Sequence, residues 1–133
     1  MILKTRKKQL KRSKIDKLRE ECGVFGISDH SDASALVALG LHALQHRGQE
    51  GCGIVSFNGE SFHSEKRQGL VGDHFTKGDT IKKLPGSFAI GHNRYSTTGE
   101  TSLRNIQPFF ADLFGGGLSI SHNGNLTNAI SLR

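Results

Sequence analysis

The sequence predicts a mixed α+β domain that follows a short basic segment. Short apolar runs alternate with a longer helical pattern, and 17 glycines stand against two prolines in 133 residues. Strands and helices on a glycine-rich frame are typical of a sheet-rich domain whose tight loops surround a site. The length fits one domain.

In the first half, residues 22–27 are expected to form a buried strand. Ser31-Asp32 is a good helix cap for a helix over 33–46, which would end before Gly48. Its predicted apolar face consists of Leu36, Leu39, Gly40, Ala43 and Leu44. An Asn-Gly turn at 58–59 predicts a hairpin between strands 53–57 and 60–66.

In the second half, a loop with Gly69 and Gly72 leads to a weak helix over 80–84. A strand is then expected over 87–92, and it is followed by a polar loop at 94–99. The next hairpin pairs 108–114 with 118–121 around three glycines, and a helix begins at 126–130. Because the chain stops at 133, inside this helix, we expect it to be a fragment of a longer reading frame.

Charge is concentrated in residues 1–21, which hold nine Lys or Arg against three acids, whereas residues 22–133 hold nine of each. A basic leader that binds RNA or acidic surfaces is therefore one open hypothesis, although the segment lacks aromatic residues for base stacking. No apolar run is long enough for a signal peptide or a membrane span. Two cysteines indicate reduced thiols in a cytoplasmic protein.

Cys22 lies where the basic leader meets the predicted domain, with a glycine after it. A small buried core residue is the ordinary interpretation of such a cysteine. If the leader is removed, however, the thiol and a free α-amino group belong to one residue. An α-amine has a pKa of about 8, so its neutral form can accept a proton near pH 7. Nucleophile and base would then be the same residue.

Four motifs occur in the order and spacing of a class II glutamine amidotransferase: CGVFGI at 22–27, LQHRGQEG at 44–51, GHNRYSTTG at 91–99 and SHNGNL at 121–126. HRGQE together with RYSTTG resembles the amidophosphoribosyltransferase branch of that family. The resemblance runs from Cys22 to the end of the chain. It implies the αββα four-layer sandwich of N-terminal-nucleophile hydrolases, incomplete here, with residues 1–21 as a propeptide.

The resemblance also implies roles for single residues. Cys22 would attack the side-chain amide of glutamine, while Asn123 and the backbone N–H of Gly124 form the oxyanion hole. Arg94 would bind the glutamine α-carboxylate, because a guanidinium pairs with carboxylate through two hydrogen bonds. Tyr95 and Thr97 would line the same pocket. Arg47 and Gly48 would shape the site, with Arg47 ordering the region of Cys22.

For the whole protein, the family implies a phosphoribosyltransferase half that binds 5-phosphoribosyl diphosphate with magnesium and uses the ammonia for purine synthesis. It also implies a homo-oligomer, in some members with an iron–sulfur cluster in that half. Neither cofactor is expected within the present segment, nor is nucleic acid or a membrane as partner. The aspartate that holds the glutamine ammonium group would lie beyond Arg133. We therefore expect this chain alone to be inactive or poorly folded.

Alternatives remain open at this point. The acceptor domain could be that of another class II amidotransferase, such as glucosamine-6-phosphate synthase, or the chain could be a non-catalytic remnant. His42 and His46 have the spacing of a metal pair on a helix, yet no third ligand is evident. Cys52 is expected to pack rather than react. Asn93 departs from the family's usual apolar residue, which could slightly disturb Arg94.

Overall fold

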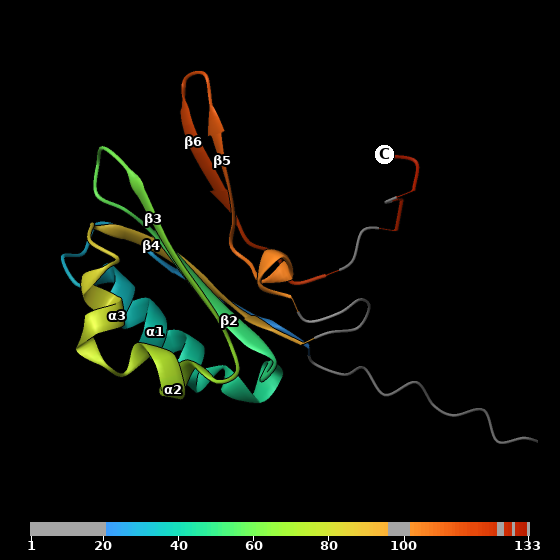
Figure 1. The fold of residues 1–133 in the computed structure, drawn as a ribbon, viewed down its shortest axis with the longest axis horizontal. Coiled ribbons are helices and arrows are strands. Elements are labelled where there is room, and N and C mark those ends of the chain that lie inside the picture. Colours follow the sequence, from blue (N-terminus) through green and yellow to red (C-terminus); the bar gives the residue numbers. More distant parts are fainter. Residues whose placement is uncertain (1–20, 96–101, 125–126, 129, 133) are drawn as a thin grey trace, which may run out of the picture.

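The computed structural model describes residues 21–95, 102–124, 127–128 and 130–132 (Figure 1). An antiparallel four-stranded sheet forms the centre, in the order β1-β4-β2-β3. Its strands span Gly23–Ile27 (β1), Gly51–Phe57 (β2), Phe62–Gln68 (β3) and Phe88–Arg94 (β4).

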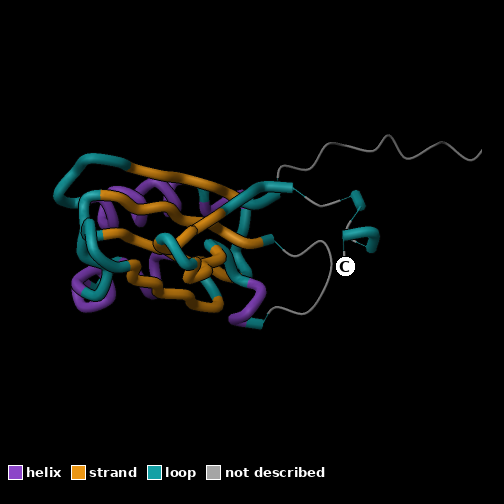
Figure 2. Tube along the Cα trace, turned by 90° about the horizontal axis from the view of Figure 1, so that it is seen from above, coloured by secondary structure: helices purple, strands orange, loops and turns teal. Residues whose placement is uncertain are grey.

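Helices cover one face of this sheet, and a hairpin lies on the other face (Figures 1 and 2). The helices span Ala33–Ala43 (α1), Val71–Phe75 (α2) and Gly78–Lys82 (α3), with short 3-10 turns at Gln45–Arg47 (η1) and Leu103–Asn105 (η2). The hairpin pairs Phe109–Leu113 (β5) with Gly116–Ile120 (β6). The predicted α+β class is therefore confirmed, with a helical layer and two strand layers.

Helix α1 packs on β1 and β4, but not through the predicted face. Its buried residues are Ala33, Ser34, Val37, Ala38 and Leu41, whereas Leu39 is 67% exposed. The reason is close approach to β4. A Cβ on Gly91 would lie 2.6 Å from side-chain carbons of both Val37 and Leu41, so the missing side chain at Gly91 is what lets these two residues pack on the strand. Helical spacing alone did not distinguish two overlapping apolar stripes.

Three local predictions also differ from the structure. Helix α1 ends at Ala43 and gives way to η1, three residues earlier than expected. The loop between β2 and β3 has four residues, because Phe57 pairs with Phe62 and Asn58 Oδ1 accepts the N–H groups of Glu60 and Ser61. Helix α2 was missed, since its glycine made the segment resemble a loop.

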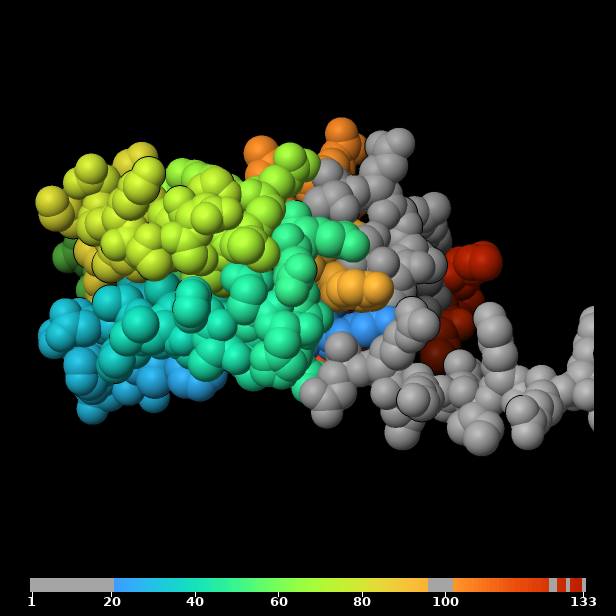
Figure 3. Space-filling model, turned by 90° about the horizontal axis from the view of Figure 1, so that it is seen from below, coloured from blue at the N-terminus to red at the C-terminus, as the bar shows by residue number. Residues whose placement is uncertain are grey.

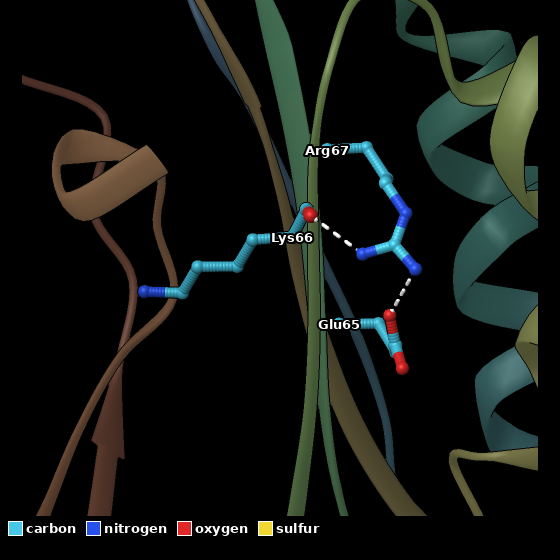
Figure 4. A network of polar contacts seen from close by, with 3 residues as sticks. All are labelled: Glu65, Lys66 and Arg67. Carbon is cyan, nitrogen blue, oxygen red and sulfur yellow. Dashed lines mark hydrogen bonds and ion pairs between the residues drawn. The ribbon is translucent and has the colours of Figure 1, made fainter. Parts of the chain in front are cut away.

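The two faces of β3 show how the layers are connected (Figure 4). Glu65 and Arg67 form an ion pair on the face toward the helices, while Lys66 points the other way. There the Lys66 ammonium lies 5.4 Å from the ring centroid of Phe109 in β5, and burial lowers the pKa of Lys66. The Phe62 and Phe110 rings, with centroids 5.0 Å apart, add an aromatic contact between β3 and the hairpin.

The register of the sheet determines which residues meet at its edge. Because β1 runs antiparallel to β4 with Gly23 opposite Asn93, the start of β1 lies beside the end of β4. Figure 3 shows these two segments emerging next to each other, beyond the helical layer. Within the described residues, none of the helices has the length and apolar character needed to cross a membrane.

Candidate active site

Cys22 stands immediately before β1, half-buried, with its thiol against the backbone of Tyr95. The Tyr95 N–H donates to Cys22 Sγ at 3.4 Å, and Sγ lies 3.6 Å from the Tyr95 carbonyl oxygen. The thiol and the loop that follows β4 are thus brought together by the register of β1 and β4.

Arg47 holds the backbone of Cys22 from both sides. Its Nε donates to the Cys22 carbonyl oxygen at 2.7 Å, and its own carbonyl oxygen accepts the N–H of Cys22 at 2.8 Å. Gly48 is buried directly behind this turn. A Cβ on Gly48 would lie 2.8 Å from both the carbonyl carbon and the oxygen of Arg94, so only glycine allows η1 to lie this close to β4.

Gln45 connects this turn to the helical layer, a contact that sequence analysis missed. Its Nε2 donates to the carbonyl oxygen of Gly48 at 2.5 Å, and its Oε1 accepts the N–H of Val71 at 2.8 Å. The position of Gln45 within the LQHRGQEG motif was the available signal. One amide thus ties the turn below Cys22 to the start of α2.

Arg94 is the last residue of β4, whereas the sequence placed it in a loop. Its Nη1 donates to the carbonyl oxygen of Asn105 in η2 at 2.9 Å, and its Nε is buried without a partner among the described residues. The guanidinium is therefore oriented by one neighbour while retaining donors for an anion. Tyr95, the next residue, is 40% exposed, and Thr97 lies outside the described residues.

Asn93 does not disturb Arg94, contrary to the expectation from sequence. Successive side chains on a strand point to opposite faces. The Asn93 amide accordingly lies on the helical side and donates to the carbonyl oxygen of Leu41 at 2.6 Å.

Asn123, one of the two predicted oxyanion residues, lies beside Cys22 although 101 positions separate them in the chain. Asn123 Nδ2 is 3.5 Å from the Cys22 carbonyl oxygen, which is the long limit for a hydrogen bond. Gly124 has φ of +152°, a conformation that side chains disfavour, so a glycine is required there. The N–H of His122 donates to Oε1 of Gln107 at 2.7 Å, a second contact that sequence analysis missed.

Two buried titratable groups lie in the sheet near this site. His92 is 1% exposed, and burial lowers its pKa to about 4, with the charges of His122 and Arg94 acting in the same direction. It is therefore neutral at pH 7. Burial raises the pKa of the fully buried Cys52 thiol to about 12. Cys52 consequently stays protonated and packs in the core, whereas Cys22 is only half-buried.

The possible metal pair is not realised on one helix, because His42 belongs to α1 and His46 to η1. Within the described ranges, no group of three or more His, Cys, Asp or Glu side chains is placed to hold a metal ion.

Known proteins resemble the chain in both sequence and structure. It is 64% identical over 118 residues to the amidophosphoribosyltransferase of Rhizobium etli, a match covering 89% of this chain and 24% of that protein. It is 48% identical over 122 residues to the amidophosphoribosyltransferase of Bacillus subtilis, covering 91% of this chain and 25% of that protein. No family model matches.

Among solved structures, the allosteric regulatory enzyme of purine biosynthesis superposes with a TM-score of 0.75 at 46% identity, covering 82% of this chain and 23% of that one. The glutamine phosphoribosylpyrophosphate amidotransferase of B. subtilis, complexed with ADP and GMP, gives a TM-score of 0.73 at 45% identity, with the same shares covered.

The layered fold and its structural neighbours define an α+β domain of the N-terminal-nucleophile hydrolase class. Within that class the chain is homologous to amidophosphoribosyltransferases over most of its own length. It spans about a quarter of the length of these relatives.

Proposed function

We propose that this chain is the glutamine-hydrolysing part of an amidophosphoribosyltransferase. One observation carries the proposal most directly. The thiol of Cys22 faces a backbone N–H, its α-nitrogen is held by Arg47, and Asn123 reaches the same residue from the far end of the chain. Homology to amidophosphoribosyltransferases supplies the choice of substrate class.

The proposed reaction begins with attack of the Cys22 sulfur on the side-chain carbonyl carbon of glutamine. The thiol proton passes to the free α-amine of Cys22 and from there to the departing nitrogen, which leaves as ammonia. The sulfur–carbon bond so formed is a γ-glutamyl thioester. Water then attacks the thioester, releasing glutamate and returning the proton to the thiol.

Arg47 supports this chemistry by orienting the α-nitrogen. Its carbonyl oxygen accepts one N–H of that nitrogen, which restricts the directions in which the lone pair of a free amine can point. Its side chain fixes the Cys22 carbonyl oxygen at the same time. The amine would thus meet the thiol in a defined geometry.

The basic segment 1–21 would act as a propeptide. While Glu21 is joined to Cys22, the nitrogen is an amide and cannot accept a proton, so the precursor should be inactive. Cys22 has φ of +60°, a conformation that costs a non-glycine residue about 1–3 kcal/mol. Cleavage of the bond between Glu21 and Cys22 would release this strain, because φ is no longer constrained at a free N-terminus.

Substrate binding would rest on the loop after β4 and on the segment after β6. Arg94 would bind the glutamine α-carboxylate, with Tyr95 and Thr97 lining the pocket. The amide of Asn123 and the N–H of Gly124 would stabilise the negative charge on the carbonyl oxygen. In this structure Asn123 points at the Cys22 carbonyl, so it would need to turn toward the bound substrate.

The acceptor half of the reaction would take place elsewhere in the protein. There ammonia would displace diphosphate from 5-phosphoribosyl diphosphate and give 5-phosphoribosylamine. Among the described residues, no group of three or more His, Cys, Asp or Glu side chains is placed to hold a metal, so magnesium or an iron–sulfur cluster would belong to that other half. Two free thiols fit a reducing compartment such as the cytoplasm, and a homo-oligomer is expected by homology.

The decisive experiment measures the N-terminus and the activity of the protein purified from its native host. Intact mass should place the mature N-terminus at Cys22, and the protein should release glutamate and ammonia from glutamine. Cys22→Ser should abolish this release while ammonia-dependent formation of phosphoribosylamine persists. Full activity with Met1 retained, or unimpaired glutamine hydrolysis in Cys22→Ser, would contradict the proposal.

A further inference from the structure

Gln107 lies between the central sheet and the segment that carries Asn123 and Gly124. Its backbone is pressed against β2, where a Cβ on Gly53 would come within 2.3 Å of the Gln107 carbonyl oxygen. The preceding Ile106 is fully buried against Gly51 of the same strand. Gln107 itself is only 7% exposed. The backbone from which its side chain extends is therefore fixed on the sheet.

The side chain of Gln107 is aimed at the oxyanion segment. Its Oε1 accepts the N–H of His122 at 2.7 Å, across 15 positions of sequence and the whole β5–β6 hairpin. A backbone N–H can only donate, so the atom opposite it must be the carbonyl oxygen and not the amide nitrogen. This contact closes the base of the hairpin immediately before Asn123.

Other side chains around this segment leave polar atoms unpaired. Among the described residues, the buried side-chain atoms without a partner belong to two short stretches, His92 to Arg94 and Ser121. His92 lies opposite Gly53 in the register of β2 and β4. The contact from Asn123 to the Cys22 carbonyl oxygen is long, at 3.5 Å. The short bond from Gln107 is therefore a well-formed anchor in a sparsely bonded region.

We propose that Gln107 is a positioning residue for the oxyanion hole: its side-chain carbonyl fixes the His122 N–H and so sets where the donors of Asn123 and Gly124 lie relative to Cys22. This inference rests on the proposed glutamine hydrolysis. Oxyanion donors act only within a narrow range of distances from the oxygen they stabilise. A segment released from Gln107 would keep both donors but hold them less accurately.

Two substitutions in the protein produced by its native host separate this role from simple packing. Gln107→Met has a similar length but no hydrogen-bond acceptor, whereas Gln107→Glu keeps an acceptor oxygen. We expect Gln107→Met to lower kcat for glutamine hydrolysis by about 10- to 100-fold. KM for glutamine should stay within about twofold, since the side chain of Gln107 bonds to His122, whereas Arg94, the residue proposed to bind the α-carboxylate, is held by Asn105. Gln107→Glu should restore most of the lost kcat.

A second measurement does not depend on activity. The His122 amide should exchange its hydrogen with solvent faster in Gln107→Met than in the wild type, and at a near wild-type rate in Gln107→Glu. Unchanged kcat in Gln107→Met, a lowered kcat without faster His122 exchange, or failure of Gln107→Glu to restore kcat would each overturn the inference. If the wild type releases no glutamate, the proposed function fails. Unaltered hydrogen exchange of the His122 amide in Gln107→Met would separately refute the role of the Gln107–His122 bond.

Discussion

Cys22 and Arg47 form two reciprocal hydrogen bonds, although 25 positions separate them in sequence. Arg47 Nε donates to the carbonyl oxygen of Cys22 at 2.7 Å, and the N–H of Cys22 donates to the carbonyl oxygen of Arg47 at 2.8 Å. The second bond uses only main chain and survives any substitution at position 47. The first depends on the guanidinium, so its contribution can be measured separately.

Arg47→Gln should therefore remove one of the two bonds and leave the other. A hydrogen bond from a charged donor contributes about 1.5–3 kcal/mol, so kcat for glutamine hydrolysis should fall by roughly 10- to 100-fold. Steady-state kinetics and the rate of Cys22 alkylation would check this. The matched control is Arg67→Gln, which breaks the ion pair with Glu65 on β3 and should leave kcat near wild type. Equal losses in both variants would contradict a specific role for Arg47.

Arg94→Lys tests whether the Arg94 guanidinium binds the glutamine α-carboxylate. Lysine keeps the positive charge but cannot form two parallel hydrogen bonds, and it also loses the geometry of the bond to the Asn105 carbonyl oxygen. KM for glutamine should rise by about 30-fold or more, corresponding to about 2 kcal/mol, with a smaller change in kcat. Arg104→Lys, at an exposed position in η2, is the control. An unchanged KM in Arg94→Lys would assign carboxylate binding to another residue.

Much of the fold could be predicted because local patterns determine strands well. The apolar runs at β1 and β4 and the glycine-flanked hairpin of β5 and β6 were all expected. The buried side of α1 was not, since it depends on the absence of a side chain at Gly91 in a strand 50 positions further along the chain. The buried side of α1 is therefore determined by a tertiary contact, which the periodicity of the helix sequence does not contain.

The candidate site likewise contains residues that the sequence could identify and residues that it could not. Motif order was enough to name Cys22, Arg94 and Asn123, and the structure places Cys22 in contact with both the end of β4 and Asn123. Sequence could not identify Gln45 or Gln107, because their amides act on backbone groups that only the folded chain brings near. The sequence-based expectation that Asn93 could disturb Arg94 was also wrong, because the Asn93 side chain lies on the face of β4 opposite to that of Arg94.

His92 should make the stability of the fold depend on pH. Its pKa of about 4 in the folded protein lies below the ordinary 6.5, so folding favours the neutral ring. This contribution is fully present above about pH 6.5 and is lost as the pH falls from 6.5 toward 4, by at most about 3 kcal/mol. Denaturant unfolding of the wild type at several pH values in that window should show the decline.

His92→Asn should flatten this pH dependence, because the group that gains a proton on unfolding is gone. His42→Asn provides the control, since His42 is exposed on α1 and lies on the far side of the sheet. A wild-type pH slope in His92→Asn would show that other groups dominate acid unfolding.

Gly48→Ala tests whether the close approach of η1 to β4 places Cys22, the proposed nucleophile. The new methyl group would lie 2.8 Å from the carbonyl group of Arg94, and neither backbone can yield without moving Arg47 away from Cys22. We expect a loss of about 1–3 kcal/mol in the free energy of unfolding and at least a tenfold lower kcat. Gly78→Ala is the matched control: nothing lies within 4 Å of its added methyl, and alanine favours the helix α3 that begins there. Should Gly48→Ala retain wild-type kcat despite reduced stability, the turn would be a packing element, and the orientation of Cys22 would have to come from the Tyr95 side alone.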